Sequence, residues 1–252
     1  MITAYHRPKT LDEALTLLTQ PNRIPLGGGT LLSRQTVDSV EAVDLQSLNL
    51  DTIERQGNNL KVGATVTLQQ FLESEHCPKA LKSAIKLEAP LNLRNAATVA
   101  GTLVSCDGRS TFATIMFALD AKIEQMKLDN SNIESRVSNI GDFLPLRNIQ
   151  GWLITSVTVP LSVKLAFDYV SRTPADKPIV CAALAQWNSG RTRLALGGYG
   201  KSPLLAMDGT EAEGVETAAP NAFHEATDQY GSAEYRMDVA ATLATRCVES
   251  IQ

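Results

Sequence analysis

Residues 94–121 read RNAATVAGTLVSCDGRSTFATIMFALDA, and the fold prediction for the whole chain starts from this stretch. The β-branched and apolar run from Thr98 to Leu103 predicts a strand, and a polar turn follows at residues 105–109. The next run, Phe112 to Leu119, has few charges and predicts a helix. A small-residue turn that leads into a helix points backbone N–H groups at an anion, and the helix dipole adds to the attraction. The stretch therefore predicts an anion-binding turn.

A second turn of this kind lies upstream in residues 24–32, IPLGGGTLL. A Walker A loop would end in G-K-[ST], but Gly29 is followed by Thr30 and Leu31, which excludes a P-loop. The dinucleotide fingerprint G-x-G-x-x-G fails because its third glycine is missing. For residues 27–29, a plain tight turn without a ligand remains an alternative. For the downstream segment Thr98–Thr102, the alternative is a buried strand in which small residues allow close packing. Two anion-binding turns in one chain predict a ligand that carries a pyrophosphate.

Taken in order along the chain, these segments resemble the FAD-binding (medium) subunit of molybdenum hydroxylases of the carbon monoxide dehydrogenase and xanthine dehydrogenase type. That family carries A-G-G-[TQH]-[SD]-L, which residues 27–32 resemble, and R-N-x-G-T-I-G-G-N-L-A-x-A-D-P-x-x-D-L-P, which aligns without a gap from Arg94. Weaker matches follow the same order, at residues 5–8 (YHRP), 11–15 (LDEAL), 60–64 (LKVGA), 193–198 (RLALGG) and 231–236 (GSAEYR). The resemblance therefore covers essentially the whole chain.

The resemblance implies an α+β fold. It comprises a two-part FAD-binding domain of the vanillyl-alcohol-oxidase (PCMH-like) type and a small C-terminal α+β domain with an antiparallel sheet. The expected units are residues 1–55, 56–162 and 163–252. FAD is expected between the first two, since each supplies one glycine turn. The implied cofactor-binding residues are Gly27, Gly28, Gly29, Thr30, Leu31, Thr98, Val99, Ala100, Gly101, Thr102 and Thr111.

The same resemblance implies the function of an electron-transfer subunit. A substrate would be oxidised at a molybdopterin-binding large subunit, and electrons would pass through a 2Fe-2S small subunit to FAD in this chain and on to an external acceptor. The chain is therefore expected to be an oxidoreductase subunit that does not act alone on the substrate. We find no convincing acid, base or nucleophile in the sequence, which agrees with chemistry that belongs to a cofactor.

Several positions depart from the family pattern. Ala97 and Ala100 stand where the family has glycine, Thr102 where it has asparagine, and Thr111 where it has aspartate. Alanine disfavours φ > 0, and one threonine hydroxyl replaces a separate donor and acceptor. We therefore expect FAD to bind about 10- to 100-fold more weakly than in typical relatives. Two alternatives stay open: a same-fold structural or assembly subunit that binds FAD weakly or not at all, and a flavoprotein that acts alone.

Composition narrows the remaining classes of function. The net charge of −4 gives no indication of a basic surface for nucleic acid. The sequence contains no run of 18 apolar residues, so we expect no transmembrane helix. The first residues lack the apolar core of a signal peptide, and the four cysteines are scattered without a C-x-x-C pair. We therefore expect a cytoplasmic protein without a metal or iron–sulfur site of its own.

Periodicity predicts most of the other elements. Helices are expected at 11–18, 68–72, 79–87 and 233–251, with Thr10 and Thr67 as N-caps and Glu13 completing a capping box with Thr10. Strands are expected at 40–45, 60–64, 122–128, 152–159, 166–170, 180–187 and 191–197. A helix is expected to begin at Pro203-Leu204, and residues 208–220 are expected to form a mobile connection. Asp107 and Arg109 are interpreted as a solvated turn, with contact to a ligand or partner as the alternative.

Overall fold

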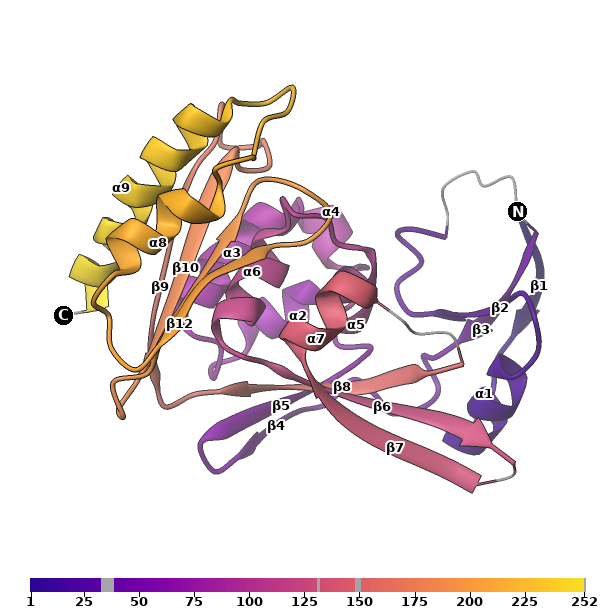
Figure 1. Ribbon diagram of the computed structural model, residues 1–252. Coiled ribbons are helices and arrows are strands. Elements are labelled where there is room, and N and C mark those ends of the chain that lie inside the picture. The colour runs from indigo at the N-terminus through magenta and orange to yellow at the C-terminus, as the bar shows by residue number, and fades with distance from the viewer. Residues whose placement is uncertain (33–38, 131, 148–150, 252) are drawn as a thin grey trace.

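The computed structural model describes residues 1–32, 39–130, 132–147 and 151–251. Its described strands form three sheets, and the helices of the middle of the chain lie between the two larger ones (Figure 1). The smallest sheet is parallel, in the order β1-β3-β2, and lies beside the helix α1. These elements are β1 (Ile2–His6), α1 (Leu11–Leu18), β2 (Arg23–Leu26) and β3 (Val40–Asp44).

Helix α1 begins and packs as its sequence predicts. The Thr10 hydroxyl caps it by accepting a hydrogen bond from the Glu13 N–H at 3.2 Å, but the Glu13 carboxylate accepts from Lys9 N rather than closing a box on Thr10. Its buried side chains, Leu15 and Leu18 among them, form a small core with β3 and with Leu153 of the next sheet. The first unit is therefore joined to the second by apolar contact.

The second sheet is antiparallel, in the order β4-β5-β8-β6-β7. Its strands are β4 (Ile53–Gln56), β5 (Asn59–Gly63), β6 (Lys122–Asp129), β7 (Asn132–Asn139) and β8 (Leu153–Pro160). The helices of this part of the chain are α2 (Leu68–Glu73), α3 (Lys79–Glu88), α4 (Leu91–Arg94), α5 (Val99–Ser105), α6 (Thr111–Ala118) and α7 (Ile140–Leu146). Since β4 pairs with β5, a boundary near residue 55 would cut a hairpin, and we propose to place it before Ile53.

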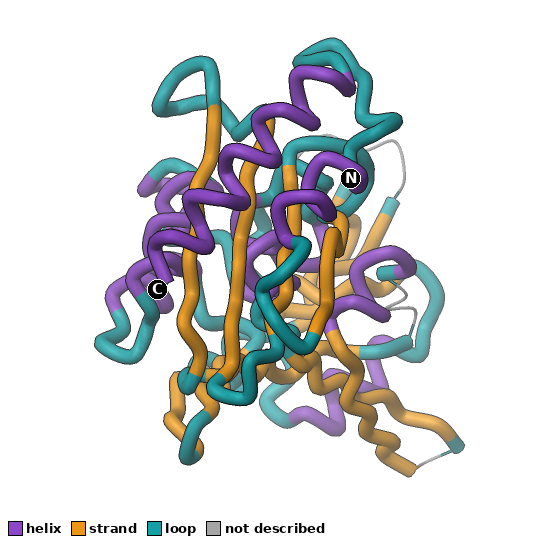
Figure 2. Tube along the Cα trace, turned by 60° about the vertical axis from the view of Figure 1, so that its left-hand side comes forward, coloured by secondary structure: helices purple, strands orange, loops and turns teal. Residues whose placement is uncertain are grey.

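The third sheet is antiparallel and has helices against both faces (Figure 2). It comprises β9 (Val163–Val170), β10 (Val180–Trp187), β11 (Thr192–Gly197) and β12 (Leu204–Gly209), followed by α8 (Val215–Ala222) and α9 (Ala233–Ile251). Strand β10 is apolar on both faces because Ala183 and Ala185 pack into the core with α3 and α6, while Ala182 and Leu184 pack against α9. This explains why its sequence does not alternate between polar and apolar residues.

The expected strand at Thr98–Leu103 is wrong, because Val99 to Ser105 form helix α5. In this segment the only strand-like pairing among described residues is an isolated antiparallel bridge between Thr98 and Thr67. The Thr98 hydroxyl accepts a hydrogen bond from the Gly101 N–H at 3.1 Å and so caps the helix. This local hydrogen bond prevails over the weak strand preference of the β-branched residues in this segment.

Two expectations in the third unit are also wrong. The segment after Pro203 is strand β12, because it pairs with β11, as Leu204 does with Leu196. Residues 208–220 are not a featureless connection but contain most of α8, whose Val215 and Ala219 are buried. A short helix with two buried positions gives too weak a periodic signal to recognise in a polar segment.

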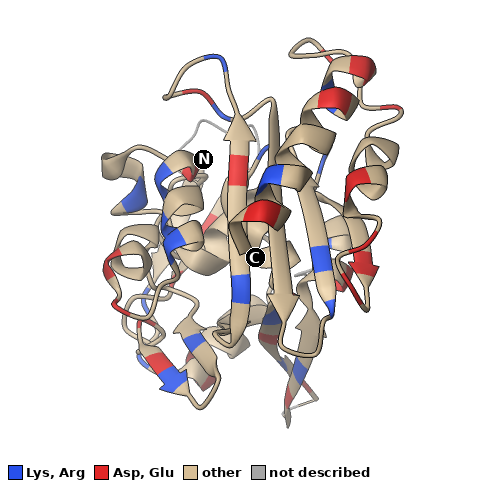
Figure 3. Cartoon of the chain, turned by 90° about the vertical axis from the view of Figure 1, so that its left-hand side faces the viewer, with Lys and Arg blue, Asp and Glu red and all other residues tan. Residues whose placement is uncertain are grey.

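Basic and acidic residues are interspersed along α9 and among the strands of the third sheet (Figure 3). None of the described elements on this side of the cartoon carries a cluster of basic residues alone, whereas a nucleic-acid-binding element carries clustered Lys and Arg. None of the helices in the described part of the chain is both long enough and apolar enough to cross a bilayer.

Candidate cofactor site

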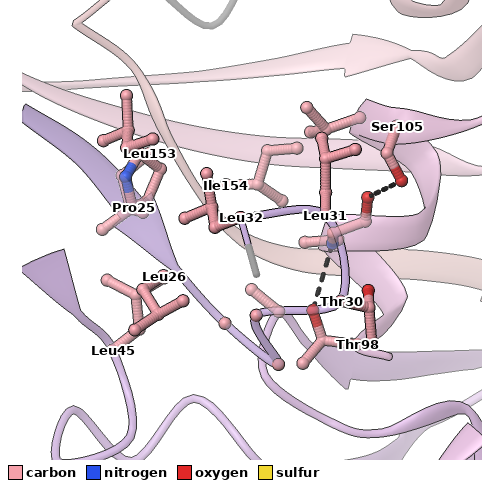
Figure 4. Close-up of a pocket in the computed structure, with 18 of the residues that line it drawn as sticks. Pro25, Leu26, Thr30, Leu31, Leu32, Leu45, Thr98, Ser105, Leu153 and Ile154 are labelled. Carbon is pink, nitrogen blue, oxygen red and sulfur yellow. Dashed lines mark hydrogen bonds between the residues drawn. The ribbon is translucent and has the colours of Figure 1, made fainter. Parts of the chain in front are cut away.

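A cavity of about 230 Å³ lies where the glycine turn after β2, helix α5 and the start of β8 meet (Figure 4). Its lining residues are Ile24, Pro25, Leu26, Gly27, Gly28, Gly29, Thr30, Leu31, Leu32, Leu45, Ala64, Thr98, Ala100, Gly101, Val104, Ser105, Trp152, Leu153 and Ile154. The structure thus brings Gly28 and Gly101, which lie far apart in sequence, to the same cavity. None of the described lining side chains is ionisable, so this wall supplies shape and hydrogen bonds rather than acid–base chemistry.

The glycine turn is pressed against the segment that leads into α5. A Cβ atom on Gly28 would lie 1.5 Å from the carbonyl oxygen of Ala96, and one on Gly27 would lie 2.8 Å from Thr98 Oγ1. Gly29 has φ of +69°, in the left-handed region that glycine adopts without strain. The three glycines therefore permit the close approach of the two segments that form one end of the cavity.

The backbone N–H groups of the glycine turn are available as hydrogen-bond donors. Within the part of the chain that the structure describes, no residue accepts a hydrogen bond from the N–H groups of residues 27–31. These residues all line the cavity. Residues 27–30 are half-buried and Leu31 is exposed, so a ligand can reach their amides, and successive amides at a cavity wall suit an anionic ligand group.

Donation from the second predicted turn, Thr98–Thr102, is not what the structure supports. The N–H groups of Val99 and Ala100 donate to the carbonyls of Val66 and Ala64, at 2.9 and 3.2 Å. Those of Gly101 and Thr102 donate to the side chain and the carbonyl of Thr98. Thr98, Ala100 and Gly101 therefore line the cavity, while the amides of residues 99–102 already donate to the carbonyls of Ala64 and Val66 and to Thr98.

Three of the predicted site residues lie outside the cavity. Val99 is buried in the core of the second unit. The Thr102 hydroxyl donates to the Thr98 carbonyl at 2.8 Å, and the Thr111 hydroxyl donates to the Ala84 carbonyl at 2.7 Å. Both hydroxyls are thus engaged in hydrogen bonds within the protein, and Ser110 is the N-cap of α6.

The anion at the start of α6 belongs to the protein itself. The Glu88 carboxylate accepts hydrogen bonds from the Phe112 N–H at 3.0 Å and from the Ser110 hydroxyl at 2.8 Å. A carboxylate at a helix N-terminus satisfies the same unpaired donors that a ligand phosphate would. The donors at the start of α6 are therefore taken by the protein's own carboxylate.

Asp107 and Arg109, the polar residues of the turn before α6, bind the third unit. Arg109 Nη2 donates to the Lys177 carbonyl at 2.6 Å, and its guanidinium lies 4.0 Å from the centre of the Tyr230 ring. Asp107 pairs with the Lys177 ammonium at 3.3 Å. These contacts tie the second and third units together, so neither side chain stands free as a ligand contact.

The apolar walls of the cavity were not expected from the sequence. Leu45, Val104 and the residues from Trp152 to Ile154 line it, and the Trp152 ring is covered by the Arg136 guanidinium at 4.0 Å. Their sequence patterns indicate only strand or helix, because apolar residues that face a cavity look like apolar residues that face a core. No group of three or more potential metal-binding side chains occurs among the described residues.

Comparison with known proteins gives one family. Residues 1–162 match the model of the FAD-binding domain in molybdopterin dehydrogenase. Among individual sequences, the Escherichia coli protein YgfM is 26% identical, over 96% of this chain and 94% of its own. The glyceraldehyde dehydrogenase medium chain of Sulfolobus acidocaldarius is 23% identical, over 98% of both chains.

Two solved structures have a similar fold along nearly the whole length. Quinoline 2-oxidoreductase from Pseudomonas putida superposes with a TM-score of 0.81 at 23% identity, over 98% of this chain and 96% of that one. The Cu,Mo-CO dehydrogenase in its cyanide-inactivated form also gives 0.81 at 23% identity, over 100% of this chain and 98% of that one. The α+β architecture, antiparallel C-terminal sheet included, is therefore shared with these proteins.

Proposed function

The chain belongs to the family of FAD-binding domains in molybdopterin dehydrogenase, and from that membership we propose that it is the electron-transfer subunit of a heteromeric molybdenum hydroxylase. Electrons from an iron–sulfur cluster in a partner chain would leave through its FAD to an external acceptor. The partners would be a molybdopterin-binding large subunit and a 2Fe-2S small subunit.

The cavity beside the glycine turn carries this proposal. The residues present fit the cofactor: the amides of residues 27–31 have no acceptor among described residues and suit the pyrophosphate, and the apolar walls suit a flat ring. When bound, the flavin supplies the redox chemistry. The chain's own contribution is to hold it between the first two units and to shield it with Leu26, Leu45 and Ile154.

A substitution at the rim of the cavity tests the site. Ser105 lines the cavity, is exposed, and its hydroxyl only donates to the Gly101 carbonyl one turn earlier in α5. Ser105→Trp should fill the mouth of the cavity and weaken FAD binding at least about tenfold in a flavin fluorescence titration. Ser83 on α3 makes the same kind of bond, to the Lys79 carbonyl, and is also exposed but outside the lining, so Ser83→Trp is the matched control.

The outcomes separate the possible functions. If the unmodified chain binds no FAD, the alternative of a structural or assembly subunit with this fold is favoured. If it binds FAD and Ser105→Trp binds it equally well, the cofactor lies elsewhere. Electron transfer itself requires that the chain co-purify with an iron–sulfur chain and that cluster reduction bleach the flavin absorbance in that complex. A flavin-containing chain that purifies alone and reduces an acceptor unaided would instead be an independent flavoprotein.

A further inference from the structure

Strand β7 is the outer strand of the five-stranded sheet, and none of the residues that the structure describes pairs with its outer edge. Its eight residues pair with β6 without a register shift, and it contains neither proline nor lysine. All side chains from Ile133 to Val137 are exposed, with Ile133 at 45% and Val137 at 64%. Proteins usually protect such edges with short strands, bulges, prolines or charged side chains, most often lysine. The charges that β7 carries, Glu134 and Arg136, are of opposite sign, so they do not repel a second copy of the same strand. At the opposite edge of the sheet, β4 has only four residues.

The two faces of β7 differ in chemistry. Ile133 and Val137 point to the same side as Ser135, and on that side Ile133 lies opposite Leu128, which packs against the α1 core. Glu134 and Arg136 point to the other side, where the Glu134 carboxylate pairs with Lys127 at 2.9 Å. Arg136 is held over the Trp152 ring. Both charged side chains are therefore positioned by their own chain.

The order of these residues is complementary to itself. Read in either direction, residues 133–137 give an apolar residue, a charge, Ser135, the opposite charge and an apolar residue. In an antiparallel pair of two copies centred on Ser135, Ile133 of each copy faces Val137 of the other, and Glu134 faces Arg136. A slip of one residue would place charges against apolar side chains. Opposite charges and apolar pairs directly across two strands stabilise the pairing.

We propose that β7 is an interface for a second copy of this chain, which pairs through this strand in the Ser135-centred register and continues the sheet across a two-fold axis. A two-fold interface uses the same surface on both copies, and that requires such self-complementarity. The interface is small, so the association is expected to be weak and to depend on protein concentration.

Cross-linking with an introduced cysteine tests the register. The four natural cysteines are buried, so a new exposed cysteine reacts selectively. In the proposed pair Ser135 lies opposite itself, and directly opposed Cα atoms are about 4.5–5.5 Å apart, within the range of a disulfide. Ser135→Cys should therefore give a disulfide-linked dimer on mild oxidation of the purified full chain. Asn132→Cys is the control, because its two copies would lie about 20 Å apart.

Charge reversal tests the complementarity in solution. Glu134→Arg places two like-charge pairs across the interface and should raise the dimer dissociation constant about tenfold or more in sedimentation experiments. Adding Arg136→Glu restores opposite charges and should restore the dimer, which a merely structural role of either residue would not do. Glu54→Arg on β4, which is also exposed, is the control at the other edge.

The result expected is a concentration-dependent dimer, linked through position 135 and not 132, weakened by the single reversal and recovered by the double one. A chain that stays monomeric at every concentration overturns the proposal. So does equal cross-linking at 132 and 135, or a double reversal that remains monomeric while its circular dichroism is unchanged. If the new thiol of the Ser135→Cys variant is shielded from thiol reagents only in a complex with a different subunit, the edge binds that subunit and the proposal is overturned.

Discussion

At the scale of single residues, Ala100 is one of the residues of α5 whose side chains line the candidate cofactor cavity. Its N–H donates to Ala64, and glycine would keep that bond while removing the methyl group from the wall. We expect Ala100→Gly to tighten FAD binding about three- to tenfold and to cost about 1 kcal/mol of stability in the helix. Flavin fluorescence titration and urea unfolding measure the two effects.

Thr102 is the contrasting case. Its hydroxyl is turned into the helix toward the Thr98 carbonyl, which also accepts from the Thr102 N–H. Thr102→Val should therefore leave FAD affinity unchanged and lower stability by less than about 1.5 kcal/mol. A loss of affinity in this variant would show that the hydroxyl reaches the cofactor after all.

The four cysteines give a prediction about reactivity. Burial raises the pKa of Cys77, Cys181 and Cys247 to about 12 and that of Cys106 to about 11. Because the thiolate is the reactive form, alkylation at pH 8 should be about 100-fold or more slower in the folded than in the urea-unfolded chain. Mass spectrometry after iodoacetamide counts the modified thiols.

The raised pKa values of the four thiols also predict how the free energy of unfolding changes at alkaline pH. Unfolded thiols ionise above about pH 8.5 while the buried ones stay neutral. Their contribution to stability is therefore complete below that pH and is lost as the pH rises toward 11 to 12. A cysteine that alkylates rapidly in the folded chain would contradict the burial of its thiol.

At the scale of elements, the start of α6 depends on a carboxylate from α3. Glu88→Ala would leave the Phe112 N–H and the Ser110 hydroxyl without this acceptor, and we expect a loss of about 1–3 kcal/mol in urea unfolding. Glu73 on α2 is exposed and accepts only from Gln69 one turn away, so Glu73→Ala should change stability by no more than about 0.5 kcal/mol. Equal effects would mean that the cap adds nothing specific.

Elements with a strong periodic signal could be predicted from the sequence. The range of α9, Ala233–Ile251, is confirmed, as are the caps at Thr10 and Thr67. Helix α5 could not be predicted, because its identity rests on the Thr98 cap and on contacts of its first turn with residues 64–66. Strand β12 likewise exists because β11 offers it an edge, which no local pattern reveals.

At the scale of the whole molecule, an ion-pair network joins the second and third units. Arg191 on the β10–β11 turn binds Asp208 at 2.8 Å and Asp120 at 2.9 Å, and the buried Arg193 donates to Asp208 as well. Asp120 follows α6, whereas the other three residues belong to the third sheet and its turn. The network therefore helps to fix how the third unit sits on the second.

This network makes an acid-dependent prediction. The hydrogen bond from Arg191 holds the pKa of Asp208 below its usual value. A depressed carboxylate contributes stability above its unfolded pKa of about 3.9 and loses it as the pH falls below that value. The Asp208→Asn variant should thus be less stable than the unmodified chain at pH 7. Its free energy of unfolding should also fall less between pH 5 and pH 3 than that of the unmodified chain. Urea midpoints across that range measure it, and parallel curves for the two proteins would contradict it.

The location of the cavity could be predicted from the two glycine-containing motifs, since Gly28 and Gly101 do meet there. Its chemistry could not, because the donors of Val99, Ala100 and Thr102 are satisfied within the protein. The cavity walls around Leu45 and Trp152 could not be predicted from the sequence either, because they depend on which sheets face each other. Motifs locate a site, while hydrogen-bond accounting in three dimensions decides which members face the ligand.

The distribution of the cavity walls along the chain has a consequence for biosynthesis. The glycine turn is made early, but the opposite wall at Leu153 and Ile154 comes from β8, the last strand of the second sheet in chain order. At the usual rate of translation the ribosome needs on the order of 10 s to get from one to the other. If FAD binds in this cavity as proposed, a nascent chain cannot complete the site until β8 has emerged and paired with β5, and cofactor loading follows the synthesis of residues 1–160.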